Sequence, residues 1–237
     1  MTDQNKKSVR ELSELLSVSE VTIRQDLTLL EDKGILKRIH GAAMLNDVDD
    51  LAVRLGINYP VKLKIAEKAA GFVKEGETVL IESGSVNALL ATLLVKTKKV
   101  TILTTNIFIA RQFRDMRNAS IILLGGLYQH ESESMVGMLT KTGIDILNFS
   151  KAFLGIDGYE ETSGFTSRDM LRAEISAYII SKCDDSFIVS DSTKFGKKEL
   201  ATIGYPGDIS HLVTDVGIED KYIKYLAGHG MEVVIAR

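Results

Sequence analysis

The spacing of apolar positions near the start of the chain predicts two short helices. The first spans residues 7–16 and has four apolar side chains on one face, namely Val9, Leu12, Leu15 and Leu16. The second follows a turn and has an apolar inner face, namely Ile23, Leu27 and Leu30. Ser17 lies three residues before Glu20, which is the spacing of a capping box at the start of the second helix. Gly34 is expected to end that helix, because glycine adopts a left-handed cap at little cost.

After Gly34 apolar and polar residues alternate, which predicts a strand with one apolar face. Together with the two helices, this strand predicts a winged helix-turn-helix domain over residues 1–50. The apolar positions are Ile35, Leu36 and Ile39, and the polar positions are Lys37, Arg38 and His40. The outer face of the second helix carries side chains that suit base edges and phosphates in a DNA major groove. The candidate DNA-binding residues are Ser19, Thr22, Arg24, Gln25, Thr28, Lys37, Arg38 and His40.

A polar, acidic segment separates this part from the rest of the chain. Residues 46–50 read NDVDD, and residues 51–60 continue as a connector that ends at Pro60, where proline is expected to stop regular structure. We expect the domain boundary within this segment. The predicted domains are residues 1–50 and 61–237, joined by a linker over residues 51–60.

Short apolar runs alternate with helical patterns from residue 61 onwards. The runs include TVLIE, VTILT, SIILL, KAFLGI and DSFIVS, followed by HLVTD and MEVVIA. Runs that are apolar throughout are typical of parallel strands buried on both faces. The predicted fold is therefore α/β, with a mostly parallel sheet and helices on both of its faces. A helix is expected over residues 135–147 and a long polar loop over residues 157–169.

Small and polar residues follow five of these strands, at the sheet edge where α/β proteins bind ligands. Glycines let backbone amides approach an anion, hydroxyl groups donate to it, and Lys194 adds a positive charge. Asp157 or Asp191 can accept from hydroxyl groups, so the pattern favours a phosphate carried by a small polyol or sugar. The candidate ligand-binding residues are Ser83, Gly84, Ser85, Asn87, Thr105, Asn106, Gly125, Gly126, Asp157, Gly158 and Lys194.

The composition of the chain bears on its compartment and on metal or membrane binding, but it does not distinguish between functions. The chain has 237 residues, a net charge of −3 and a single cysteine, Cys183, so it has no intrachain disulfide and the cytoplasm is the expected compartment. The N-terminal residues show no apolar signal sequence, and no apolar run approaches the length of a membrane span. The four histidines show no metal-ligand spacing, and we expect no cofactor.

Residues 17–43, SVSEVTIRQDLTLLEDKGILKRIHGAA, resemble the DNA-binding signature of the DeoR family of bacterial transcriptional regulators. Gln25 replaces the family's usual arginine, and Ala42 replaces the second glycine of its wing motif. Domains of this family normally have another helix before the first one predicted here. Because few residues precede Lys7, we expect that helix to be missing and the apolar backs of the other two helices to be exposed.

The rest of the chain resembles the sensor domain of the same family. The matching segments are ESGSVN, TTN, LLGG, FLGIDGYEETSGFT, Ala173-Glu174 and DSTKFG. The resemblance implies a fold like that of ribose-5-phosphate isomerase and a phosphorylated sugar as effector. It places the effector on seven of the candidate residues, Ser83, Ser85, Thr105, Asn106, Gly126, Asp157 and Lys194. Asn87 follows Val86 where the family usually has two hydroxyl residues.

Three functions are compatible with these patterns. The first is a transcriptional regulator, a repressor of sugar-metabolism genes, which binds operator DNA as a dimer or tetramer and responds to a sugar phosphate. The second is a sugar-phosphate isomerase that would use Asp157, Glu160, Glu174 and Lys194. The third is a sensor that does not bind DNA and acts through protein partners. The joining of a recognition-helix motif to an anion-binding pattern favours the regulator, and we predict no enzyme activity.

Overall fold

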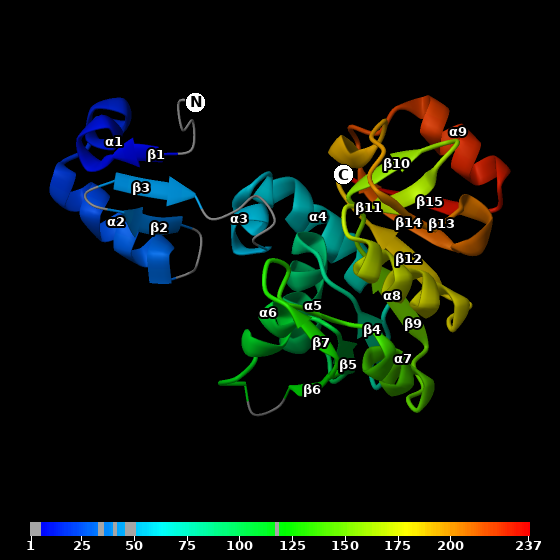
Figure 1. Cartoon of the computed structure of the whole chain (residues 1–237). Coiled ribbons are helices and arrows are strands. Elements are labelled where there is room, and N and C mark those ends of the chain that lie inside the picture. The colour runs from blue at the N-terminus through cyan, green and yellow to red at the C-terminus, as the bar shows by residue number, and fades with distance from the viewer. Residues whose placement is uncertain (1–5, 33–35, 40–41, 46–50, 117–118) are drawn as a thin grey trace. The chain divides into compact units, whose positions relative to one another are not determined.

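The structure, a computed structural model, describes residues 6–32, 36–39, 42–45, 51–116 and 119–237 (Figure 1). Contacts between Cα atoms divide the chain into two compact units, Met1–Ile57 and Asn58–Arg237. They are called the N-terminal unit and the C-terminal unit.

The N-terminal unit is a winged helix-turn-helix, as predicted. Its elements are β1 (Lys6–Ser8), α1 (Val9–Leu16), α2 (Glu20–Asp32), β2 (Leu36–Ile39) and β3 (Ala42–Leu45). The strands form an antiparallel sheet in the order β1-β3-β2. Its small core consists of Val9, Ile23, Leu27, Leu36 and Ala43. Gly34, which was expected to end α2, lies outside the described residues.

The helix caps differ from the prediction. Ser17 does not start α2; it ends α1 in a left-handed conformation, with φ 55° and its backbone N–H bonded to Ser13. The capping box lies at Ser8, whose hydroxyl accepts from the Glu11 amide at 3.2 Å and whose own amide donates to the Glu11 carboxylate at 2.6 Å. Ser19 caps α2 instead, because its hydroxyl accepts from the backbone N–H of the third residue beyond it, at 3.1 Å.

The apolar face predicted for the first helix is only half buried. Val9 is buried, whereas Leu15 and Leu16 are 67% and 59% exposed. Both leucines lie near the end of α1, where the described residues of this unit provide too small a core to cover them. The exposure of these two leucines agrees with the expectation from the sequence that the apolar back of this helix is not covered.

Residues 51–60 contain helices rather than an extended connector. Helix α3 spans Leu51–Gly56 and α4 spans Tyr59–Ala70. Pro60 lies in the first turn of α4, a position that tolerates proline because the backbone N–H there has no partner within the helix. The prediction that Pro60 ends regular structure is therefore wrong.

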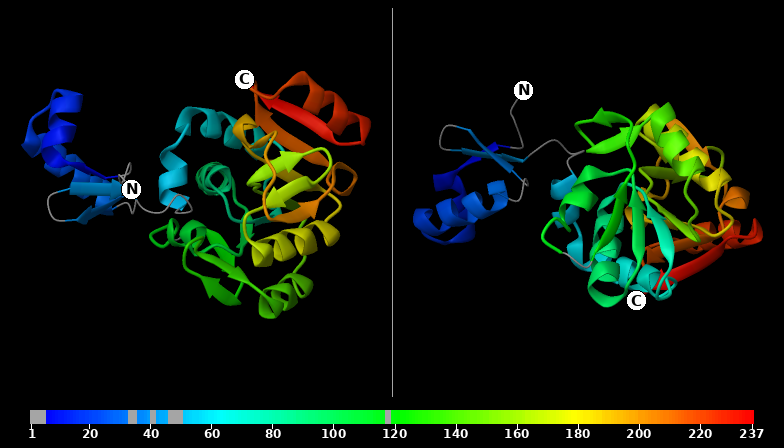
Figure 2. Two further views of the ribbon diagram at one scale, coloured as in Figure 1. Left: turned by 45° about the horizontal axis from the view of Figure 1, so that its top comes forward. Right: turned by 90° about the horizontal axis from the view of Figure 1, so that it is seen from below.

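A seven-stranded sheet, parallel throughout, forms the centre of the C-terminal unit and confirms the predicted α/β fold (Figure 2). The strands are β4 (Thr78–Ile81), β5 (Thr101–Thr104), β6 (Ser120–Leu123), β9 (Lys151–Leu154), β12 (Ser186–Val189), β14 (His211–Asp215) and β15 (Glu232–Ala236). Their order is β15-β14-β12-β9-β4-β5-β6. The central strands are buried on both faces, which explains why they are apolar throughout.

In the described part of this unit, six α-helices accompany the sheet. Besides α4 they are α5 (Ser85–Thr97), α6 (Ile107–Arg111), α7 (Met138–Asp145), α8 (Met170–Ser181) and α9 (Asp220–Gly228). Helix α4 packs against α5 and contacts β12, β14 and β15, while α8 contacts β9. A hydrophobic core cluster joins the sheet to these helices, and it includes Leu80 of β4, Ile179 of α8 and Leu226 of α9.

Two regions of the C-terminal unit differ from the prediction. The expected polar loop over residues 157–169 forms a hairpin of β10 (Gly158–Glu160) and β11 (Gly164–Ser167), and β13 (Ala201–Gly204) extends it into a small sheet. Its aromatic residues Tyr159 and Phe165 pair in register and are fully buried. Part of the expected helix over residues 135–147 is a strand instead, since β8 (Ser134–Val136) pairs with β7 (Leu127–Gln129) before α7 begins.

Candidate DNA-binding helix and effector site

Helix α2 presents an exposed polar face. Ile23 and Leu27 are buried and hold the helix on the unit, which confirms the predicted inner face. Thr22, Arg24, Gln25 and Thr28 are exposed on the other side, and so is Ser19 before the helix begins. These side chains are therefore accessible to the bases and phosphates of a DNA major groove.

Hydrogen bonds along α2 order part of this face. Arg24 pairs with Glu20 one turn earlier at 3.4 Å, and the Thr28 hydroxyl donates to the Arg24 carbonyl at 2.8 Å. The hydroxyl groups of Ser19 and Thr22 lie 2.9 Å apart. An arginine and several hydroxyl groups thus lie on one surface of the helix, which is the chemistry that phosphates and base edges require.

The wing strand β2 carries Lys37 and Arg38 next to this helix in sequence. Lys37 pairs in register with Met44, and Arg38 with Ala43. Their backbone positions are therefore those of a wing, as predicted, while His40 lies outside the described residues. The DNA contacts assigned to these three residues stay predictions.

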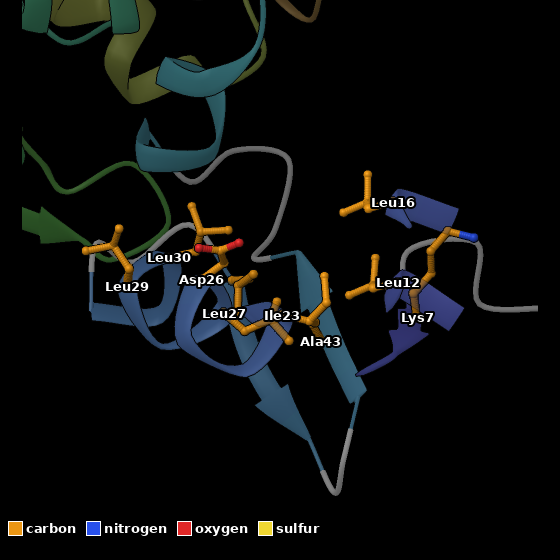
Figure 3. A pocket seen from close by; sticks show the side chains of 10 residues that line it. Lys7, Leu12, Leu16, Ile23, Asp26, Leu27, Leu29, Leu30 and Ala43 are labelled. Carbon is orange, nitrogen blue, oxygen red and sulfur yellow. The ribbon is translucent and has the colours of Figure 1, made fainter. Parts of the chain in front are cut away.

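The other side of α1 and α2 is an open apolar groove of about 510 Å³ (Figure 3). It is lined by Lys7, Leu12, Leu16, Ile23, Asp26, Leu27, Leu29, Leu30, Leu36 and Ala43. Leu29, like Leu16, is more than half exposed. Within residues 6–32 the first helix is α1, and its apolar back is exposed as the sequence led us to expect.

The five loops proposed as an effector site lie along one edge of the C-terminal sheet. They follow β12, β9, β4, β5 and β6, which are consecutive neighbours and all parallel. Their carboxyl ends therefore meet at the same edge, which is where open α/β sheets bind ligands. The loops after β4 and β9 are in direct contact, because a Cβ added to Gly155 would lie 2.9 Å from the Ser83 carbonyl oxygen.

Two of the candidate amides hold this edge together. The Asn87 side chain donates to the carbonyls of Ser83 at 3.0 Å and Phe153 at 3.1 Å, so it joins the ends of β4 and β9. The Asn106 side chain donates to the Ser132 carbonyl at 2.8 Å and caps α6 through the amide of Ile109 at 3.0 Å. Both side chains are buried. Their amide groups therefore position the loops, and an effector contact by either stays a prediction.

The two candidate aspartates are also buried. Asp191 accepts from the backbone N–H of Thr193 at 3.1 Å and so caps a short 3₁₀ helix that ends at Lys194. Asp157 accepts from the backbone N–H of Arg168 at 3.2 Å. Of the remaining candidates, Ser83, Gly84, Ser85, Thr105 and Gly158 are buried, Gly126 and Lys194 are half-buried, and Gly125 is exposed.

A buried ionic cluster beside Asp157 was not identified from the sequence. Glu82 directly follows β4 and is only 6% exposed, and its carboxylate accepts from the Gly155 amide at 3.4 Å. Arg172 of α8 is also buried, with its guanidinium 3.9 Å from the Asp157 carboxylate and 4.0 Å from that of Asp169. One guanidinium therefore lies among several carboxylates at the predicted effector edge.

Burial dominates the electrostatics of this cluster. It raises the pKa of Glu82 to about 7, although the charge of Arg172 and the hydrogen bond from Gly155 act in the opposite direction. The nearby charge of Asp157 raises this pKa further. Glu82 is thus a carboxyl group that changes protonation near neutral pH. The signals in the sequence were an acidic residue directly after an apolar strand and an arginine between the apolar residues Leu171 and Ala173 of a helix.

Within the described ranges, no group of three or more histidine, cysteine, aspartate or glutamate side chains is placed to hold a metal ion. The same part of the chain has no helix that combines the length and the apolar character needed to span a membrane. Cys183 is buried in the core of the C-terminal unit, and burial raises the pKa of its thiol. The described residues thus combine an exposed polar face on α2 with five loops along one edge of the C-terminal sheet.

Comparisons with known proteins agree with this arrangement. A model of the DeoR-like helix-turn-helix domain matches residues 1–49, and one of the DeoR C-terminal sensor domain matches residues 57–216. FruR, an uncharacterised HTH-type transcriptional regulator of Bacillus subtilis, is 33% identical over 87% of this chain and 84% of its own length. A lactose phosphotransferase system repressor of Streptococcus mutans is 30% identical over 91% of this chain and 88% of its own.

Similarity to solved structures concerns part of the chain. Ribose 5-phosphate isomerase A of Methanocaldococcus jannaschii is 20% identical, with a TM-score of 0.40. The match covers 60% of this chain and 56% of that structure.

A winged helix-turn-helix followed by an α/β sensor unit defines a class of DNA-binding transcriptional regulators. The two family models cover most of the chain, and the chain belongs to the DeoR family. Its relatives regulate transcription and are not enzymes. The prediction of a DNA-binding regulator is thereby confirmed, and the isomerase alternative is not supported.

Proposed function

We propose that this regulator represses genes for the uptake or metabolism of a sugar, and that a phosphorylated sugar bound by the C-terminal unit controls it. The observation that carries the proposal is the combination of the exposed polar face of α2 with five polar strand ends along one sheet edge. The similarity to a lactose phosphotransferase system repressor supports a sugar-related set of target genes.

The DNA side of the proposal uses α2 as the recognition helix. Arg24, Gln25 and Thr28 would contact bases and phosphates in the major groove, with Ser19 and Thr22 at the start of the helix. Lys37, Arg38 and His40 of the wing would add phosphate contacts. Operators with two half-sites suit a two-fold protein, so we propose a homo-oligomer, a dimer or a tetramer, acting on DNA in the cytoplasm.

The effector side uses the carboxyl edge of the sheet. Backbone amides of the Ser83–Ser85 and Gly125–Gly126 turns and the Lys194 ammonium would bind the phosphate. Asp157 would accept from sugar hydroxyl groups, and Glu82 lies close enough to the same loops to take part. The effector would favour one arrangement of the regulator over another and so change its affinity for DNA. No cofactor is required.

Two exposed arginines allow a matched test of the DNA contact. Arg24 and Arg10 lie on neighbouring helices, and each pairs with a glutamate one turn away, at 3.4 and 3.0 Å. Arg24→Ala should weaken binding to the DNA upstream of the gene about tenfold or more, the effect of losing one good base contact. Arg10→Ala should leave the affinity within about twofold, since Arg10 lies outside the proposed contact surface.

Fluorescence anisotropy with labelled upstream DNA at several salt concentrations measures both effects. Specific binding should weaken steeply as salt rises, because phosphate contacts release counterions. Equal losses in the two variants would contradict the assignment of α2. A wild-type chain without salt-sensitive affinity, whether or not sugar phosphates are present, would contradict the proposed function itself.

A further inference from the structure

Helix α7 exposes apolar side chains to a degree that is unusual for a surface helix. Met138, Leu139 and Ile146, which is its C-terminal cap, are 76%, 72% and 74% exposed. Thr140 and Ile144 are the buried residues of the helix. A surface helix normally turns its apolar side to the core and its polar side to water. The outer side of α7 is instead its more apolar side.

The charged residues of α7 are used within the C-terminal unit. The Lys141 ammonium pairs with Glu174 of α8 at 2.6 Å. The Asp145 carboxylate pairs with Lys182 at 2.7 Å and accepts from the Tyr178 hydroxyl at 2.7 Å. Both charges of the helix are thus directed toward α8 and the residues that follow it. The opposite side of α7 has only apolar residues and Thr142 to present to its surroundings.

Neighbouring elements extend this apolar surface. Ile122 of β6 and Leu127 of β7 are 39% and 62% exposed. They lie beside α7 for two reasons. A Cβ added to Gly143 of α7 would lie 3.3 Å from the Leu124 side chain, which shares its face of the extended chain with Ile122. Leu127 pairs in register with Val136, just before α7 begins. In Figures 1 and 2 these green elements lie together at the end of the C-terminal unit where β6 forms the sheet edge. We call the surface the α7 face and define it by Ile122, Leu127, Met138, Leu139 and Ile146.

The size of the α7 face fits an interface. For side chains of ordinary size, the exposed fractions correspond to roughly 600 Å² of surface, about what one partner contributes at the lower end of stable protein–protein interfaces. Contiguous apolar patches of this size are uncommon on chains that stay monomeric. In the described part of the sheet β6 also pairs with β5 alone, so one backbone edge is open beside the patch.

We propose that the α7 face binds the same face of a second copy of this chain and forms a two-fold dimer. A two-fold interface must be complementary to itself, and a surface without charged side chains meets its own copy without repulsion between like charges. The open edge of β6 and the area of the patch both suit such a partner. The polar pairs between α7 and α8 border the apolar surface on one side, and polar groups beside an apolar centre are usual in protein interfaces.

Sedimentation velocity of the full chain at about 1–50 μM tests the proposal. We expect the wild type to sediment as a dimer, with twice the chain mass of 26.1 kDa. The double variant Met138→Glu, Ile146→Glu should sediment as a monomer, because its dimer would bury four carboxylates without partners. Val216→Glu is the matched control. Val216 is also an exposed apolar residue, at 68%, but it follows β14 near the opposite end of the sheet.

The substituted side chains are exposed, so both variants should keep the thermal unfolding midpoint of the monomer and the circular dichroism of the wild type. A wild-type chain that is monomeric at the highest concentration would overturn the proposal. A double variant that remains dimeric would also overturn it, since the copies would then meet elsewhere. Equal dissociation of the Val216 variant would show that the loss is not specific to the α7 face. None of these outcomes depends on whether the chain binds a sugar phosphate.

Discussion

A single buried carboxyl group sets a pH dependence on the stability of this protein. Glu82 lies at the end of β4 and faces the Arg172 guanidinium, Asp157, the Ser176 hydroxyl and the Gly155 amide. Its pKa is about 7 in the folded chain and near 4.5 otherwise. Between these values the folded chain keeps a proton that the unfolded chain has released. The free energy of unfolding contributed by Glu82 therefore falls as the pH rises from about 4.5 to 7 and stays low above that.

Glu82→Gln should remove this pH dependence. The difference in the free energy of unfolding, variant minus wild type, should increase by about 3 kcal/mol between pH 4.5 and 8. The loss of the carboxylate contacts adds an offset to this difference that is the same at every pH. Urea unfolding at several pH values measures the difference. Glu67→Gln, on the exposed side of α4, is the control and should follow the wild type throughout. Parallel curves for Glu82→Gln and wild type would show that Glu82 does not change protonation in this range.

Sequence reasoning located the candidate site at the residue scale only in part. It identified which loops share the sheet edge, because strand ends can be read from apolar runs. It missed Glu82 and Arg172, since burial depends on packing between β4, β9 and α8 that no local pattern reports. It also could not show that the side-chain amides of Asn87 and Asn106 donate to backbone carbonyls of other segments. That prediction requires knowing which strands and loops are adjacent.

At the scale of elements, the turn from β6 into β7 depends on one of its two glycines. A Cβ on Gly126 would lie 2.1 Å from the Thr140 hydroxyl and 2.6 Å from the Val136 carbonyl oxygen, whereas a Cβ on Gly125 would meet nothing within 4 Å. The backbone of Gly126 therefore passes directly against β8 and α7. This close contact fixes the hairpin of β7 and β8 on the unit.

Gly126→Ala should destabilise the C-terminal unit by about 2–4 kcal/mol, because backbone atoms of the hairpin must move to admit the methyl group. Gly125→Ala should stay within about 0.5 kcal/mol of wild type. Thermal and urea unfolding of the two variants without ligand provide the measurement. Similar stabilities for both variants would contradict the tight packing at Gly126.

Prediction of the elements succeeded for the buried parallel strands and failed where tertiary packing decides the structure. The parallel strands were predicted because each is a short run of apolar residues. The cap was misplaced because Ser8, Ser17 and Ser19 all lie near helix starts, and only the end of α1 decides among them. The hairpin over residues 158–167 was missed because a polar turn separates Tyr159 from Phe165, whose ring centroids lie 4.6 Å apart in the fold.

At the scale of the whole molecule, the proposed function requires coupling between effector and DNA. A sugar phosphate that relieves repression should weaken operator binding by about 5–150-fold, the range of typical allosteric coupling. Operator DNA should weaken effector binding by the same factor, since the linkage is reciprocal. Titrating DNA in the presence and absence of a panel of sugar phosphates, and the converse, measures both factors.

Two lysine variants test whether the effector acts through Lys194. Lys194→Ala should abolish the response to effector and keep the affinity for DNA, whereas Lys198→Ala, at an exposed position four residues further on, should retain both. A response that survives in the Lys194 variant would place the effector elsewhere. Loss of DNA binding in that variant would mean that the substitution damages the fold instead.

The position of β4 in the sheet has a consequence for how this protein is made. β4 pairs on one side with β9, whose residues follow some seventy positions later in the chain, as in the register of Val79 with Lys151. A ribosome must therefore synthesise and release residues through β9 before the middle of the sheet can close. Until then the nascent chain holds an apolar strand with an open backbone edge, and chaperone binding should be strongest during this interval.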